Sequence, residues 1–214
     1  MDTSPVLLLT GGVAGAAWGV LADRLAARWP AHPDGAVRSV DWRSVAVVAA
    51  SAVTFALLLA RWPETGDRLV LGVYLAALMV LLATDLDQRL LPDVITLPLV
   101  GYALVVLVLG WDPMLAGKEL GLVSGLAAGI GAPLVLLVTD RLFGGALGMG
   151  DVKLAVSLGL MSGVTRLLTG FLLATVVGAV VLLALMAVGR LGRRSAVPFG
   201  PILIGAGVIA TILP

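Results

Sequence analysis

The chain has 214 residues, of which 60% are hydrophobic and only 13% are charged, and its mean hydropathy is +1.10. So little charge excludes an ordinary soluble domain and indicates that lipid is the main solvent. The formal net charge of +1 leaves no basic face for a nucleic-acid partner. Cysteine is absent and His32 is the single histidine, so we expect no disulfide, no thiol nucleophile, no metal site and no cofactor.

Eight apolar segments follow one another along the chain, and most are close to the roughly 20 residues that a helix needs to cross a bilayer. They cover residues 6–22, 44–60, 69–84, 94–110, 120–138, 152–163, 167–189 and 198–213. We therefore predict an all-α, polytopic membrane protein with one domain over residues 1–214 and about eight transmembrane helices. The sixth segment is too short to span upright and the eighth is marginal, so seven helices are the alternative.

The N-terminus begins with an acidic rather than a basic segment, so we expect the first apolar segment to be retained as a membrane helix and not cleaved as a signal peptide. With the N-terminus outside, ten basic residues lie on the cytoplasmic side and four outside, as the positive-inside rule requires. The ten are Arg24, Arg28, Arg38, Arg43, Arg89, Arg141, Lys153, Arg190, Arg193 and Arg194, and the four are Arg61, Arg68, Lys118 and Arg166.

The longest cytoplasmic connection is predicted at residues 24–43, where arginines alternate with Asp23, Asp34 and Asp41. Such a loop is typical of a solvated connector. Contact with a substrate or with anionic lipid is the alternative interpretation.

Two aspartates, Asp85 and Asp151, stand at the ends of apolar segments, and the predicted topology places both on the cytoplasmic side. A carboxylate at the edge of a bilayer is costly and therefore a candidate functional residue. Two carboxyl groups brought together can activate water for hydrolysis. Asp87 is two residues beyond Asp85 and cannot share its face of a helix.

Several neighbours of these aspartates have a structural interpretation. Pro92 breaks the chain between the third and fourth segments, and Asp93 stands where an N-cap is expected. Asp151 is itself a candidate cap of the sixth segment. Gly148 and Gly150 either allow unusual backbone conformations or permit very close packing.

Lys153 is either a positive-inside lysine or a group that tunes Asp151. Pro198, Gly200 and Pro201 open the last segment. They either start a helix or hold extended backbone that a substrate strand pairs with.

At this point the chain resembles the prepilin peptidases, also called type IV prepilin leader peptidases, which are intramembrane aspartic proteases. The matching segments are DLDQRLLPDVITLP over residues 85–98, GMGDVKL over 148–154, SLGLMSG over 157–163 and PFGP over 198–201. The resemblance covers the stretch from about residue 69 to the C-terminus, and residues 14–25 resemble a diverged first helix. It implies that Asp85, rather than Asp87, and Asp151 are the catalytic aspartates.

The resemblance further implies hydrolysis at the cytoplasmic face of a prokaryotic inner or plasma membrane. The substrate would be a prepilin or pseudopilin precursor that loses a short basic leader preceding its hydrophobic helix. Many family members carry a cytoplasmic insert with four cysteines and also methylate the new N-terminus. The corresponding loop here is short and free of cysteine, so we do not expect methyl transfer.

Two other classes of function remain as alternatives. A proton- or cation-coupled transporter also uses intramembrane acids, but it should carry them near mid-span and show an internal repeat. A non-catalytic membrane scaffold is the second alternative, and the presence of both aspartates weighs against it.

Overall fold

The computed structural model describes residues 4–31, 35, 37–143, 147–187 and 199–213. They form helices and connecting loops, with no strand among these residues, which confirms the all-α prediction. The helices are α1 (Pro5–Ala26), α2 (Trp42–Arg61), α3 (Thr65–Gln88), α4 (Asp93–Val108), α5 (Gly121–Phe143), α6 (Met149–Ala187) and α7 (Gly200–Ile212).

Five of these helices, α1, α2, α3, α5 and α6, are long and apolar enough to cross a membrane, whereas α4 and α7 are shorter apolar helices. The predicted sixth and seventh segments together form α6. The helix is broken at Gly163, where φ is 65° and ψ is 179°. Essentially only glycine adopts this backbone conformation. The predicted loop at 24–43 is shorter in the structure, because α1 continues to Ala26 and α2 begins at Trp42.

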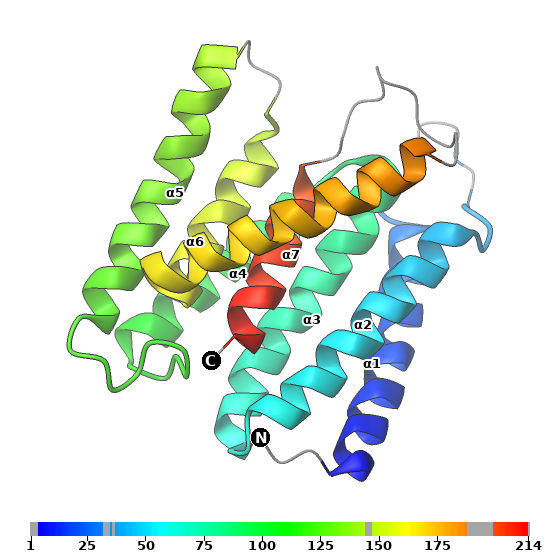
Figure 1. The fold of residues 1–214 in the computed structure, drawn as a ribbon. Coiled ribbons are helices and arrows are strands. Elements are labelled where there is room, and N and C mark those ends of the chain that lie inside the picture. Colours follow the sequence, from blue (N-terminus) through cyan, green and yellow to red (C-terminus); the bar gives the residue numbers. More distant parts are fainter. Residues whose placement is uncertain (1–3, 32–34, 36, 144–146, 188–198, 214) are drawn as a thin grey trace.

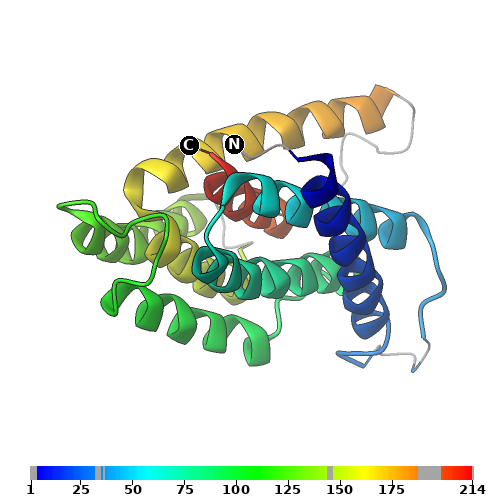
Figure 2. The same cartoon turned by 90° about the horizontal axis from the view of Figure 1, so that it is seen from below.

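Helix α7 occupies the middle of the bundle, between α3 and α6 (Figures 1 and 2). Gly207 packs closely against both neighbours, because a Cβ atom there would lie 2.5 Å from Leu158 of α6 and 3.0 Å from Leu78 of α3. Figure 1 also shows that α3 ends, and that α4, α6 and α7 begin, at the same end of the bundle. This end is called the motif end below, because residues 85–93, 148–151 and 199–201 meet there.

Helices α1 and α2 pack with their backbones in contact along a row of glycines. Gly11, Gly15 and Gly19 recur every four residues on one face of α1, and a Cβ atom at any of them would come within 3 Å of the α2 backbone. Small residues at this spacing are typical of membrane helix pairs. Because lipid is as apolar as the side chains, such helices associate through van der Waals contacts between closely packed backbones rather than through the hydrophobic effect. Gly12 has more room, since a Cβ atom there would be 4.0 Å from its nearest neighbours, Ala52 and Ala56 of α2.

We expect Gly15→Ala to destabilise the protein and Gly12→Ala to leave its stability unchanged or slightly higher. The new Cβ at position 15 would lie 2.4 Å from the carbonyl oxygen of Ser51, so the helices must separate. Overpacking of this kind costs about 1–3 kcal/mol. Thermal unfolding of both variants in detergent measures the difference, and equal midpoints would contradict the close packing of α1 on α2.

Candidate active site

Asp85 lies in the last turn of α3, and its side chain is buried against the first turn of α7. A Cβ atom on Gly200 would be 2.6 Å from the carboxyl carbon of Asp85, so the glycine backbone contacts the carboxyl group directly. The Oδ2 atom of Asp85 is buried and has no hydrogen-bond partner among the described residues. A buried carboxyl oxygen with no partner is costly and is uncommon outside functional sites.

Asp151 is the third residue of α6 and is half-buried. Its carboxyl group folds back over Gly148, where a Cβ atom would be 3.3 Å from Oδ2. Gly150 packs against the turn that follows α3, because a Cβ atom there would lie 2.7 Å from the Cβ atom of Leu91. Neither glycine has a positive φ, so close packing rather than unusual backbone conformation explains both. This packing brings the start of α6 to the end of α3.

The predicted N-cap role of Asp93 is wrong. Helix α4 begins at Asp93 itself, the cap position is Pro92, and no side chain caps the helix. The Asp93 carboxylate instead accepts a hydrogen bond of 2.7 Å from the ammonium group of Lys153. Lys153 thus ties the start of α6 to the first turn of α4.

Residues 199–201 do not form an extended strand. Gly200 is the first residue of α7, Pro201 lies in its first turn, and Phe199 before them has helical dihedral angles. The helix-start interpretation of this segment is therefore confirmed for Gly200 and Pro201. Pro198 lies outside the described residues.

The two candidate aspartates are brought together at the motif end. They come from helices that are far apart in the sequence, and their carboxyl groups are near enough for the charge on Asp151 to act on Asp85. Two carboxyl groups in such proximity do not both ionise without cost. This arrangement can supply a general base and a general acid from one site.

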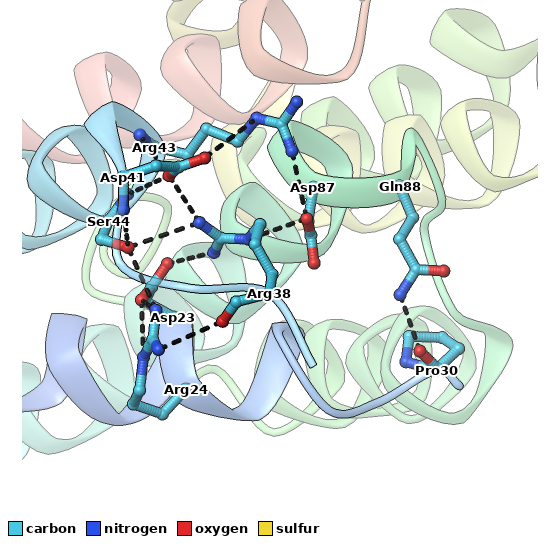
Figure 3. Close-up of polar contacts among 9 residues, drawn as sticks. All are labelled: Asp23, Arg24, Pro30, Arg38, Asp41, Arg43, Ser44, Asp87 and Gln88. Carbon is cyan, nitrogen blue, oxygen red and sulfur yellow. Dashed lines mark hydrogen bonds and ion pairs between the residues drawn. The ribbon is translucent and has the colours of Figure 1, made fainter. Parts of the chain in front are cut away.

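Beside this site, Asp87 belongs to a separate network of charged side chains that joins α1, α2, α3 and the loop at 27–41 (Figure 3). Arg38 is at its centre. The Arg38 guanidinium pairs with Asp23, with Asp41 at 2.6 Å and with Asp87 at 2.8 Å. Arg43 also reaches Asp87, at 3.2 Å. Asp87 therefore has different neighbours from Asp85, as the helical spacing predicted.

The charged groups at the centre of this network are buried, which the connector interpretation did not predict, whereas Arg24, Asp41 and Arg43 at its edge remain 30%, 33% and 34% exposed. The side chains of Asp23 and Asp87 are only 3% and 1% exposed, and that of Arg38 is 10% exposed. Burial works against the charged form of Arg38, but its hydrogen bond to Asp23 and the charges of Asp23, Asp87 and Asp41 outweigh that effect and raise its pKa. Arg38 and Asp41, from the described part of the loop, thus belong to the packed structure of the motif end. Gln88 adds a further link by donating a 2.6 Å hydrogen bond to the carbonyl of Pro30.

Sequence reasoning missed one further buried acid, Asp112, in the connection between α4 and α5. Burial raises its pKa to about 7, although a 2.9 Å hydrogen bond from the backbone N–H of Met114 and the nearby Arg166 act in the opposite direction. The only sequence signal was an aspartate directly before Pro113, a pattern that indicates a turn rather than burial. Asp112 lies in a different connection from those of the motif end.

Comparisons with known proteins identify the family of the chain. The model of the type IV leader peptidase family matches residues 72–183, slightly more than half of the chain. Three proteins named prepilin leader peptidase/N-methyltransferase are similar to it. The one from Pseudomonas putida is 35% identical over 153 residues (71% of this chain, 52% of the relative). The one from Dickeya chrysanthemi is 31% identical over 182 residues (82% of this chain, 61% of the relative). The one from Bacillus subtilis (strain 168) is 28% identical over 165 residues (76% of this chain, 60% of the relative).

The chain therefore spans between about half and three-fifths of the length of these relatives. No solved structure is significantly similar to it.

We expect Arg38→Met to destabilise the protein far more than Arg24→Met. Without Arg38, Asp23 and Asp87 each lose a partner while remaining buried, and breaking a buried ion pair from one side costs about 3–5 kcal/mol. Arg24 is 30% exposed, and Asp23 keeps Arg38 when Arg24 is removed. Thermal or denaturant unfolding in detergent compares the two, and similar losses would show that Arg38 is not the centre of the network.

Proposed function

Since the chain belongs to the type IV leader peptidase family, we propose that it is a membrane-embedded aspartic endopeptidase with Asp85 and Asp151 as its catalytic pair. The family is the one that the two aspartate motifs predicted. The observation that carries the proposal is the arrangement at Asp85. Its buried carboxyl group rests on the backbone of Gly200, leaves one oxygen without a partner and feels the charge of Asp151.

The proposed chemistry is hydrolysis without a covalent intermediate. The ionised carboxylate of the pair takes a proton from a water molecule while that water attacks the scissile carbonyl carbon. The protonated carboxyl group donates a hydrogen bond to the developing oxyanion. The tetrahedral intermediate then collapses, the C–N bond breaks, and the leaving amine receives the proton that the carboxylate took from the water. Neither step requires a metal or a cofactor.

The proposed substrate is a prepilin-like precursor whose short basic leader precedes a hydrophobic helix. The bias of basic residues supports a motif end that faces the cytoplasm, and the proposed location is a prokaryotic inner or plasma membrane. The substrate helix would then lie in the bilayer beside the enzyme, with the scissile bond at the membrane surface. The apolar surface of five spanning-length helices supports a multi-pass location.

We expect Asp85→Asn and Asp151→Asn, made separately, to abolish cleavage of a prepilin-like precursor from the same genome. Each variant keeps the size of the side chain but removes a group that must exchange a proton. Glu119→Gln, in the exposed α4–α5 connection, serves as the control and should cleave normally. Asp87 is unsuitable as a control because it is buried between two arginines. N-terminal sequencing of the product provides the readout, and normal processing by either asparagine variant removes that residue from the mechanism.

Gly200→Ala should also reduce the rate of cleavage, by about tenfold or more. The added methyl group would lie 2.6 Å from the carboxyl carbon of Asp85, so the carboxyl group must move away from its position. A displacement of about 1 Å at a catalytic group costs up to a hundredfold in rate. Gly205→Ala in the same helix is the matched control, since its Cβ would make an ordinary contact of 3.5 Å. Equal kcat values for both variants would show that the Gly200 contact has no role in catalysis.

Methyl transfer is not part of the proposed function, although the names of the relatives include N-methyltransferase. The predicted cytoplasmic loop of this chain is short, and the chain has no cysteine for a zinc-bound insert. Purified enzyme with precursor and S-adenosylmethionine should therefore yield a cleaved, unmethylated product, with or without a chelator. Mass spectrometry that finds one added methyl group on the new N-terminus would contradict this prediction.

A further inference from the structure

An apolar groove of about 290 Å³ lies between α5 and the second half of α6. Its walls include Ala128, Gly131 and Val135 of α5, Leu168 and Phe171 of α6, and Leu203 of α7, and no lining residue has a polar side chain. The groove exists because α6 changes direction at Gly163. The first half of α6 packs tightly on α5, whereas the second half runs obliquely away from α5 and across α7 (Figure 1).

The groove leads to the candidate catalytic pair. Ala155, which lines it, is four residues after Asp151 and so lies one helical turn away on the same face of α6. Leu203, which also lines it, is three residues after Gly200, whose backbone supports Asp85. A helix seated in the groove would therefore point one of its ends toward both aspartates.

The side chains of the groove suit a helix rather than a polar ligand. The α5 wall is built from small residues, Ala127, Ala128, Gly131 and Ala132, which allow the backbone of a neighbouring helix to approach closely. The rims carry large apolar side chains that are exposed on the protein surface, among them Val135 at 64% and Leu168 at 58%. The groove is thus open toward lipid, the direction from which a membrane-anchored substrate arrives.

We propose that this groove receives the hydrophobic helix of the substrate and so holds the scissile bond at Asp85 and Asp151. This inference rests on the proposed function and adds the binding site for the part of the substrate that is not cut. Lipid acyl chains, which are equally apolar, are the competing occupant, and the experiment below separates the two.

Gly131 offers a clean way to fill the groove. It lines the groove, and a Cβ atom added there would meet nothing within 4 Å, so Gly131→Leu obstructs the groove without a clash inside the enzyme. Gly101→Leu on α4 is the matched control. Gly101 is also in a helix, is exposed, has nothing within 4 Å of an added Cβ atom, and does not line the groove.

The first experiment measures cleavage of two substrates by enzyme in lipid vesicles. One is a full-length pilin-like precursor from the same genome, and the other is a peptide that spans the cleavage site and ends before the hydrophobic helix. Gly131→Leu should raise KM for the precursor about tenfold, which corresponds to about 1.4 kcal/mol of lost binding. It should leave kcat/KM for the peptide unchanged, and Gly101→Leu should alter neither. An unchanged KM for the precursor would overturn the proposal.

A second experiment reports docking without catalysis. Because the chain has no cysteine, Gly131→Cys provides its only thiol, and Gly101→Cys provides a control thiol. Each is combined with Asp85→Asn and with a precursor carrying a single cysteine in its hydrophobic helix. Disulfide formation at 131 but not at 101 supports the docking site. Equal crosslinking at both positions indicates that lipid fills the groove and refutes the proposed docking site.

The two experiments also separate this proposal from the proposed function. If wild-type enzyme cuts neither substrate, the proposed function fails, and crosslinking at 131 still decides whether the helix docks.

Discussion

The first turn of α7 rests on the carboxyl group of Asp85, and this contact exists only because position 200 has no side chain. It sets where α7 begins, and the same helix then separates α3 from α6 along the rest of its length. Since α6 carries Asp151 in its first turn, the distance between the two aspartates depends on how α7 is seated. A single close approach of backbone to carboxyl group therefore connects the packing of the bundle with the geometry of the candidate site.

Charged groups at the motif end have two different roles, one in holding helices together and one in the candidate site. Asp23, Arg38, Asp41, Arg43 and Asp87 neutralise one another and hold the ends of three helices together. Asp85 is excluded from that network although it is only two residues from Asp87. A carboxyl group paired with arginine is a poor base, because the pairing stabilises its ionised form. The α3 helix thus presents one aspartate to a structural network and the other to the candidate site, on opposite faces of the same turn.

Sequence reasoning predicted the helical class, the apolar segments and the two aspartates, because hydrophobic runs near the bilayer thickness and short motifs are local signals. It also predicted that Gly148 and Gly150 serve special backbone needs, and close packing on Leu91 is the need that Gly150 meets. The role of Asp93 was wrong because an N-cap pattern contains no information about Lys153, which lies 60 residues further along. The burial of Arg38 and the groove beside α5 were not predicted for the same reason. Both depend on which helices become neighbours, and periodicity does not specify that.

The break at Gly163 has a mechanical consequence. The backbone N–H of Val164, the next residue, donates a 3.0 Å hydrogen bond to the hydroxyl of Ser124 near the start of α5, and Leu115 of the preceding loop packs over the glycine. The second half of α6 is therefore fixed at its start by α5 and by the α4–α5 loop. The direction that α6 takes from this point determines the width of the space between α5 and α6. The shape of the groove thus depends on contacts at the opposite end of the bundle from the aspartates.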